Sequence, residues 1–268
     1  MAGLIALLAF TVAPALAITD GAPDGNGHPY VGLMVAKDAD GQPLWRCSGT
    51  LLSSTVFLTA GHCTESPAAS AVLYFDAGPI QTGAGYPAAG SNKCAGISGY
   101  PCTGDRTGSV HPIPSYDPNA FFLHDAGIVV LDTPMPMDEY GVLPSVNRFD
   151  SLKVRASTTF TAVGYGLQKA FPDAAAWKEV AVKERMVAYP HLLQVNTGFT
   201  GPGSLLLSNN AHTGGTCFGD SGGPNFIGTS NVVAGVTSFG MNGTCGGTGG
   251  VFRVDRPDVL AFIEGYMP

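Results

Sequence analysis

Apolar residues in the first half of the chain come in short runs that are separated by turn-forming residues. Residues 31–35 and 44–52 lie on either side of the turn Asp38-Ala39-Asp40-Gly41, which predicts two strands connected through it. The run 55–59 is β-branched and aromatic, a composition typical of strands, and residues 71–75 are a further strand candidate. The pattern therefore predicts short β-strands throughout this half.

Three stretches near the middle of the chain differ from these short runs. Residues 126–131 form a continuous apolar run, as expected of a strand that is buried on both faces. Residues 77–118 are rich in Gly, Pro, Ser and Asn and have little periodicity, which predicts irregular surface loops. Residues 132–144 contain three prolines, and we interpret them as a segment that crosses between two halves of the chain.

The second half resembles the first in style but ends differently. Its strand candidates are residues 157–163, 179–188, 232–239 and 250–254. The periodicity of 179–188 fits either a strand or a helix, and we favour the strand. After Pro257, apolar residues at helical spacing predict a C-terminal helix. The chain is therefore predicted to form two all-β halves followed by a helix, with no internal sequence repeat.

Composition agrees with a large β-rich core and excludes one class of partner. The chain has 268 residues, of which 45% are hydrophobic and 12% charged, and it contains 37 Gly and 20 Pro. So many turn-forming residues favour short strands over long helices. The net charge is −7 and no run of basic residues occurs, so we expect no nucleic-acid partner.

The first residues have the pattern of a secretory signal. Residues 4–17 are apolar and end in Ala15-Leu16-Ala17, a small-x-small cleavage site, although no Lys or Arg precedes them. This apolar stretch contains Pro14 and is shorter than the roughly 20 residues that span a membrane. We therefore expect a signal peptide at 1–17, secretion to the extracellular space and no stable membrane anchor. The alternative is a buried N-terminal strand.

Export makes disulfides the expected state of the six cysteines. Six cysteines allow 15 pairings, and their pattern alone does not choose among them. No cysteine lies in a CxxC motif or at a zinc-like spacing from a histidine, so we expect no metal and no cofactor.

Three residues together suggest nucleophilic catalysis. Ser221 lies in the glycine-rich stretch 217–224, which is either a tight turn or the setting of a nucleophile, and a serine nucleophile needs a base and an orienting acid. Of six histidines, His62 is held best, because it ends a stiff strand and precedes a cysteine; the alternative is a loop histidine beside a structural bridge. Asp125 opens the buried run 126–131, where a carboxylate is costly unless a group such as an imidazole pairs with it.

The motifs around these residues resemble those of one family. Thr59-Ala60-Gly61-His62-Cys63, Asp125-Ala126-Gly127-Ile128-Val129 and Gly219-Asp220-Ser221-Gly222-Gly223-Pro224 occur in the order His, Asp, Ser, and resemble the trypsin/chymotrypsin-like serine peptidases. The likeness covers residues 18–268 and is weakest in 77–118 and 167–212. It implies an all-β fold of two antiparallel six-stranded β-barrels packed together, with a C-terminal α-helix. The N-terminal barrel would be residues 18–140, with His and Asp, and the C-terminal barrel residues 141–268, with Ser.

The resemblance also implies a role for each residue of the site. Ser221 would attack the substrate carbonyl, His62 would take and return the proton, and Asp125 would orient the imidazole. The backbone N–H groups of Gly219 and Ser221 would form the oxyanion hole, and Ser238 would support the aspartate. Three disulfides follow from the same comparison: Cys47–Cys63 and Cys217–Cys245 match family bridges, which leaves Cys94 and Cys102 to pair with each other.

A further expectation concerns activation. In the family, the residue at Asp220 pairs with the free amine of an N-terminal Ile or Val that proteolysis creates. Ile18-Thr19-Asp20-Gly21 resembles such a start and follows Ala17 directly. Our hypothesis is that signal peptidase itself creates this terminus; the alternative is a separate zymogen step.

The expected substrate pocket contains no acidic residue. The resemblance assigns Gly215 to its floor, Gly240 and Gly250 to its walls and Phe218 to its rim, with Phe239 beside Ser238 in place of a tryptophan. We therefore expect an uncharged P1 side chain, large and apolar. The sequon Asn242-Gly243-Thr244 lies near this wall.

The sequence thus predicts a secreted serine endopeptidase that acts through an acyl-enzyme. Its expected partners are protein or peptide substrates and protein inhibitors, and its expected state is a monomer. Two alternatives remain, a non-catalytic homologue that binds protein ligands and an esterase or lipase. The second lacks its usual Gly-x-Ser-x-Gly turn between a strand and a helix.

Overall fold

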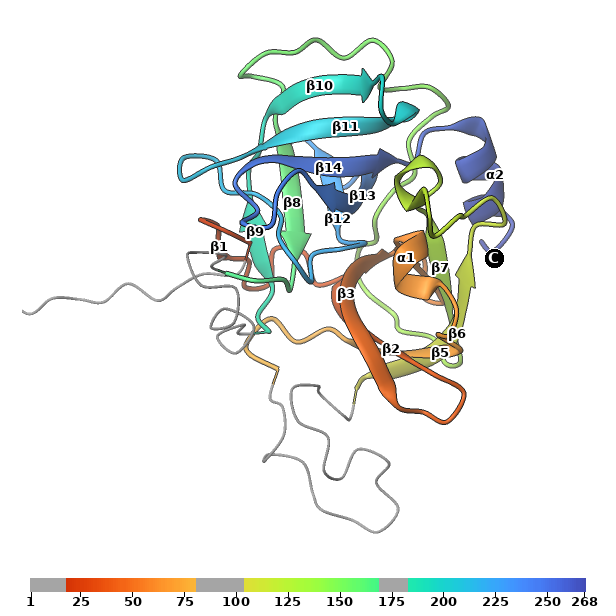
Figure 1. Ribbon diagram of the computed structural model, residues 1–268. Helices are drawn as coiled ribbons and strands as arrows, with labels where there is room; N and C mark the ends of the chain where they lie inside the picture. The colour runs from red at the N-terminus through yellow and green to blue at the C-terminus, as the bar shows by residue number, and fades with distance from the viewer. Residues whose placement is uncertain (1–17, 81–103, 169–182) are drawn as a thin grey trace, which may run out of the picture.

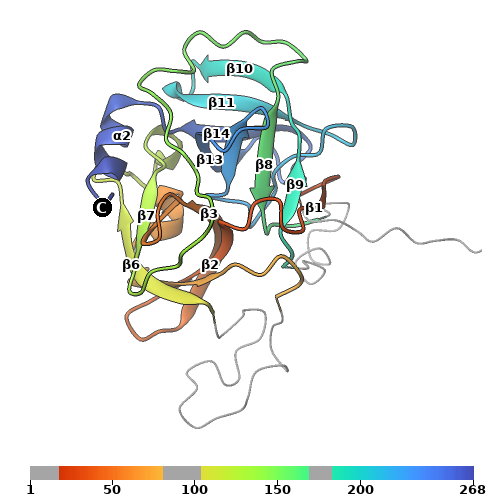
Figure 2. The same ribbon diagram turned by 180° about the vertical axis from the view of Figure 1, so that it is seen from behind.

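The computed structural model describes residues 18–80, 104–168 and 183–268. Its strands form two antiparallel units that lie side by side (Figure 1). Helix α2 (Pro257–Glu264) follows the second unit in the chain, yet it lies beside the first unit in both views (Figures 1 and 2). A contact between the rings of His111 and Tyr266, with centroids 5.0 Å apart, ties the chain end to that unit.

The first unit is a closed six-stranded barrel. Its strand order is β2-β3-β4-β7-β6-β5. These strands are β2 (Val31–Lys37), β3 (Pro43–Leu51), β4 (Val56–Thr59), β5 (Ser70–Tyr74), β6 (Arg106–Pro112) and β7 (Gly127–Leu131). Two short helical turns leave this barrel on one side, α1 (Gly61–Thr64) after β4 and the 3-10 turn η1 (Phe121–Leu123) before β7.

The second unit is an eight-stranded sheet that curls toward a second barrel. Its order is β1-β9-β8-β12-β13-β14-β11-β10. The strands are β1 (Ala22–Pro23), β8 (Phe160–Gly164), β9 (Met186–Ala188), β10 (Leu192–Thr197), β11 (Gly201–Asn209), β12 (Pro224–Ile227), β13 (Val233–Gly240) and β14 (Gly247–Arg253). A bridge between Thr159 and His191 joins the start of β8 to the start of β10. This bridge completes a ring through the six strands from β8 to β10, and β1 and β9 extend it at one side.

One apolar core cluster runs through both units. It contains Met34 and Phe57 from the first barrel and Val163 and Phe226 from the second, all buried. Because the two units share this cluster, apolar side chains pack directly across the boundary between them.

The predicted all-β architecture with a C-terminal helix is confirmed. Each strand predicted in the first half is present, with small shifts at its ends. The interpretation of 77–118 as wholly irregular was wrong, because β6 lies within it. This strand has a single clearly apolar residue, Val110, and it forms because β5 and β7 pair with its two edges. Residues 186–188 of the ambiguous segment 179–188 form a strand, and residues 179–182 lie outside the described residues.

Four strands of the second unit were not predicted, namely β1, β10, β11 and β12. The sequence of β11 lacks the alternation of apolar and polar residues that predicts a strand, because its three leucines are consecutive and it begins with Gly-Pro-Gly. Pairing with β14 along six consecutive positions defines β11 instead. Long-range pairing therefore decided these elements.

Candidate active site

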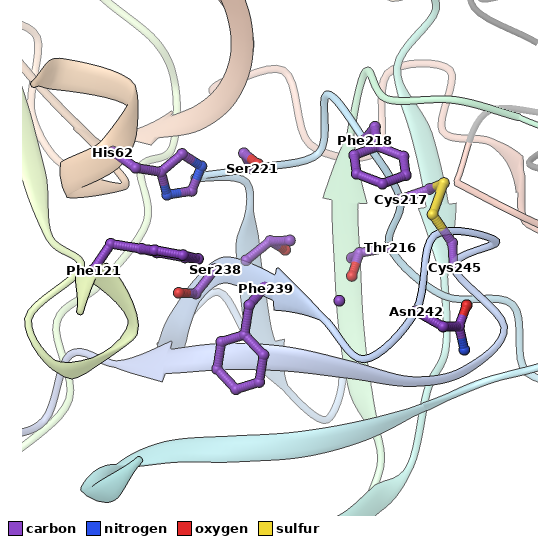
Figure 3. A pocket seen from close by; sticks show the side chains of 12 residues that line it. His62, Phe121, Thr216, Cys217, Phe218, Ser221, Ser238, Phe239, Asn242 and Cys245 are labelled. Atoms are coloured by element: carbon purple, nitrogen blue, oxygen red, sulfur yellow. A yellow bond between two sulfur atoms is a disulfide. The ribbon is translucent and has the colours of Figure 1, made fainter. Parts of the chain in front are cut away.

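The two barrels meet at a cleft with a volume of about 350 Å³, and both contribute to its lining. His62 and Phe121 come from the first barrel, and Ser221 and residues 216–218 come from the second. Figure 3 shows the His62 ring directed toward Ser221, with one ring nitrogen on the serine side. The structure therefore brings together the histidine and the serine that the sequence singled out.

His62 is held by its own short turn. It lies in α1, directly after the fully buried strand β4. A Cβ atom at position 61 would lie 2.7 Å from the ring of Tyr116, so the turn requires Gly61. On the other side, Cys63 forms a disulfide with Cys47 of β3. This bridge fixes the turn to the barrel wall and limits the positions that the imidazole can take.

Asp125 is completely buried, and its carboxylate accepts hydrogen bonds from His62 and Ser238. Its Oδ1 accepts a hydrogen bond from the backbone N–H of His62 at 2.9 Å. Its Oδ2 lies 2.9 Å from His62 Nδ1 and accepts from Ser238 Oγ at 2.5 Å. The carboxylate is thus satisfied from three directions, and the pairing expected of a buried aspartate is present.

These contacts change the protonation of His62. Burial disfavours the charged imidazole, but the negative charge of Asp125 and its hydrogen bond outweigh this and raise the pKa of His62 above its ordinary value. The charge of Glu65 acts in the same direction. Because Asp125 occupies Nδ1, the other ring nitrogen is free to exchange a proton with a group in the cleft.

Ser221 lies on a turn whose shape depends on glycines on either side of it. Gly219 has φ = 94° and Gly222 has φ = 78°, a region that side chains rarely adopt. A Cβ atom at position 222 would also overlap the side chain of Thr59. The glycine-rich sequence is therefore required by the backbone of this turn.

Ser48 anchors the same turn, and we had not predicted it because no motif around it indicates such a role. Its Oγ donates to the carbonyl of Gly219 at 2.9 Å, and its N–H donates to the carbonyl of Ser221 at 2.7 Å. Within the described residues, the N–H groups of Gly219 and Ser221 have no hydrogen-bond acceptor. Two neighbouring donors thus remain available for a bound oxygen atom.

Asp220 points away from this site into the second unit. It is completely buried, and it accepts hydrogen bonds from the N–H groups of Gly166 at 2.7 Å and Cys217 at 2.9 Å. Burial outweighs these two bonds and raises the pKa of Asp220 to about 7. Ile18 is also completely buried, in a cluster with Met186 and Ala188. The pairing predicted between Ile18 and Asp220 requires a free amine at Ile18, and it stays a prediction.

Four of the six residues expected in the substrate pocket line the cleft: Phe218, Ser238, Phe239 and Gly240. Gly215 and Gly250 are not among the residues that line it. A side chain at Gly215 would overlap Asn209, and one at Gly250 would overlap the ring of Phe239. Figure 3 shows that this ring points away from Ser221. Thr216 and Asn242 line the cleft as well, and we had not assigned them to the pocket.

An aromatic cluster extends from the cleft. Phe121 packs edge-on against the His62 ring, with centroids 5.5 Å apart. The rings of Phe122 and Phe199 stack at 4.2 Å, and Phe239 contacts both of them edge-on. Phe199 is nevertheless 60% exposed, so the cluster offers apolar surface next to the site. The residues come from three separate segments, and for this reason the sequence pattern did not reveal them.

The described cysteines form the disulfides Cys47–Cys63 and Cys217–Cys245. The expected pair of Cys94 and Cys102 lies outside the described residues. Among the described residues, the one group with metal-ligating atoms close together is Cys47, His62 and Cys63. Its two sulfur atoms are bonded to each other, so neither is a free thiolate ligand.

Two packed β-barrels with this cleft between them define the chymotrypsin-like class of serine protease folds. A sequence model described as Trypsin matches residues 20–259, and the chain belongs to this family. In none of the described segments is a helix long and apolar enough to cross a membrane.

Relatives and solved structures agree with this assignment. The chain is 26% identical over 257 residues to Serine protease 1 of Drosophila melanogaster, covering 93% of this chain and 83% of that protein. Serine protease 2 of the same organism matches equally well. Among solved structures, HL collagenase superimposes with a TM-score of 0.68 at 20% identity, covering 92% of this chain and 97% of that one. Human heparin binding protein gives a TM-score of 0.61 at 19% identity, with coverages of 92% and 96%.

Proposed function

We propose that this protein is a secreted serine endopeptidase that cleaves peptide bonds through an acyl-enzyme on Ser221. The observation that carries the proposal is the His62 imidazole, which is held at Nδ1 by a fully buried aspartate while its other nitrogen faces Ser221 (Figure 3). A serine becomes a useful nucleophile when such a base takes its proton.

The reaction follows from this arrangement. Ser221 Oγ attacks the carbonyl carbon of the scissile bond while His62 takes the hydroxyl proton, and Asp125 stabilises the imidazolium that forms. The N–H groups of Gly219 and Ser221 bind the negative oxygen of the tetrahedral intermediate. The intermediate collapses when His62 gives its proton to the leaving amine. Water then attacks the acyl-enzyme by the same route and releases the acid product.

The cleft favours an uncharged P1 residue. Among the residues that the structure describes, no acidic side chain lines it, whereas Phe218, Phe239 and the Cys217–Cys245 disulfide do. A Lys or Arg side chain would lose water there without gaining a counter-charge. A peptide library with all P1 residues tests this preference, and faster cleavage after Arg than after large apolar residues would contradict it.

Activation depends on a free amine at Ile18. The Asp220 carboxyl is buried and accepts hydrogen bonds from two N–H groups, and no cation within the described segments pairs with it, which suits a site completed by an ammonium group. Ile18 is buried in the same unit, and Thr19 pairs with Gly215 close to the Ser221 turn. Cleavage after residue 17 by signal peptidase supplies this amine. Sequencing the N-terminus of secreted protein checks it, because a mature terminus other than Ile18 contradicts this route.

The test of the proposed function is labelling with a fluorophosphonate. The mature protein should be labelled and Ser221→Ala should not. Ser230→Ala changes an exposed serine that does not line the cleft, and this variant should be labelled as fully as the wild type. Absence of labelling in folded, mature protein would favour a non-catalytic binding role. Turnover of casein against p-nitrophenyl esters separates a peptidase from an esterase.

A further inference from the structure

Asn209, the last residue of β11, lies directly against Gly215, the position that we assigned from the sequence to the floor of the substrate pocket. It is 2% exposed. A Cβ atom built on Gly215 would lie 2.5 Å from Oδ1 and 2.6 Å from Cβ of Asn209. The amide of Asn209 therefore fills the space that a side chain at position 215 would take.

Both ends of this amide are hydrogen-bonded, and they connect two other segments. Its Nδ2 donates to the carbonyl of Thr216 at 2.8 Å. Its Oδ1 accepts from Thr19 Oγ1 at 2.8 Å. The N–H of Gly215 donates to the carbonyl of Thr19 at 3.0 Å, which closes the connection. One buried side chain thus joins the segment after Ile18 to the residue that begins the cleft lining.

Thr216 transmits this connection to the cleft. It lines the cleft, and a Cβ atom at Gly249 on β14 would lie only 3.0 Å from its Oγ1. Thr216 is therefore confined between β14 and the amide below it. If the amide were removed, the carbonyl of Thr216 would lose its donor and space would open beneath Gly215.

We propose that Asn209 is a positioning residue that forms the base of the primary specificity pocket and couples that base to the docked segment at Thr19. This inference rests on the proposed function, because it concerns the pocket that receives the P1 side chain. The amide limits the depth of the pocket for large apolar residues. It also makes the shape of the pocket depend on whether residues 18 and 19 are docked.

The test uses three single variants of the mature protein. Asn209→Ala removes the amide at the bottom of the pocket. Thr19→Val removes the hydroxyl that bonds to this amide while keeping the shape of the side chain. Ser208→Ala is the matched control, because Ser208 is the buried neighbour on the same strand and bonds to His191 and Thr213 instead. The readout is the ratio of kcat/KM for peptides with Trp and with Leu at P1. A loss of folded protein cancels from this ratio.

Asn209→Ala should shift the ratio toward Trp by about tenfold, the size expected when a buried amide with two hydrogen bonds is lost. Thr19→Val should produce a smaller shift in the same direction, and the double variant should show less than the sum of the two effects. Ser208→Ala should leave the ratio unchanged. An unchanged ratio in Asn209→Ala, or additive effects in the double variant, overturns the inference.

Binding of indole separates this inference from the proposed function. Its affinity relative to that of phenol, measured by NMR titration of the mature protein, requires no turnover. If the wild type binds both but is not labelled by fluorophosphonate, the proposed function fails while the pocket can still be tested. Asn209→Ala should then favour indole over phenol by at least about threefold. Equal relative affinities in the two proteins overturn the inference.

Discussion

Asp125 and Asp220 are both fully buried carboxylates of the candidate site, and their surroundings differ in one respect. Asp125 contacts an imidazole, a backbone N–H and the hydroxyl of Ser238. Asp220 accepts hydrogen bonds from two backbone N–H groups, and no cation in the described part of the chain pairs with it. Neutral donors alone do not offset its burial, and its pKa rises to about 7.

The comparison teaches that the folded chain supplies a partner able to carry positive charge for one buried carboxylate and not for the other. The region of Asp125 contains all the partners that it needs within the folded chain. Asp220 has no cationic partner among the described residues, and in the proposed activation hydrolysis of the peptide bond before Ile18 would supply one. A protein built in this way can fold around both carboxylates and still depend on cleavage for one of them.

The largest expected effect on activity comes from removing the negative charge of Asp125. Asp125→Asn should lower kcat by about 10⁴-fold at neutral pH, because the amide would favour the wrong tautomer of His62. Steady-state kinetics with a chromogenic peptide measures the loss. Ser238→Ala is the control, since it removes one donor and keeps the charge, and it should cost far less. A loss below tenfold for Asp125→Asn would contradict the role assigned to it.

A smaller loss of activity is expected from changing Asp220, and only in protein that has been cleaved before Ile18. In the mature protein, Asp220→Asn should lower kcat/KM by about 10²–10³-fold, because it leaves the ammonium group at Ile18 buried without its partner. Asn225→Asp is the control, because it places a carboxylate at another fully buried position. It should destabilise the protein, and combining it with Asp220→Asn should not restore activity. Full activity of Asp220→Asn would refute the pairing.

The stability of uncleaved protein should depend on pH through Asp220. Its pKa is about 7 in the folded chain against an ordinary value of 3.8, so the unfolded carboxyl ionises first as the pH rises. Its contribution to the free energy of unfolding is therefore fully present below about pH 4 and is lost as the pH rises to about 7.

Urea unfolding of the Ser221→Ala protein with residues 1–17 retained measures this dependence. Asp220→Asn in the same background should flatten the curve between these pH values. In mature protein the ammonium group should reverse the trend and preserve stability at neutral pH. Identical curves for the uncleaved and mature forms would show that no pairing occurs.

The smallest expected effect concerns the acid limb of the pH–activity profile. His62 acts as a base only when it is neutral, and its pKa is raised, so kcat/KM should fall with decreasing pH at higher pH than for an ordinary histidine. Glu65→Gln removes one of the negative charges and should move this limb to lower pH, with kcat near pH 8 unchanged within about twofold. Tyr116→Phe keeps the charge of Glu65 but removes its hydrogen bond, and it is the control.

Much of the candidate site could be predicted from the sequence. Ser221, His62 and Asp125 lie in short motifs whose glycines and flanking strands are local features, and the structure brings them to one cleft. Strand β7 was predicted because its residues are apolar on both faces. Strand β6 was missed, because its neighbours β5 and β7 determine its conformation and its own residues carry little signal.

The supporting residues were decided by tertiary structure. Ser48 bonds to residues of the Ser221 turn that lie more than half the chain away, and Asn209 connects Thr19 to Thr216. Gly215 was assigned to the pocket floor by resemblance, but the space beneath it belongs to Asn209.

The sequence by itself determined the fold class, five of the six strands of the first barrel and the three residues of the proposed triad, because these depend on local apolar patterns and on motifs a few residues long. The tertiary structure decided what fills the pocket and what surrounds each buried carboxylate. The physical reason is that a pKa and a pocket depend on every atom within a few ångströms, and most of those atoms come from distant parts of the chain.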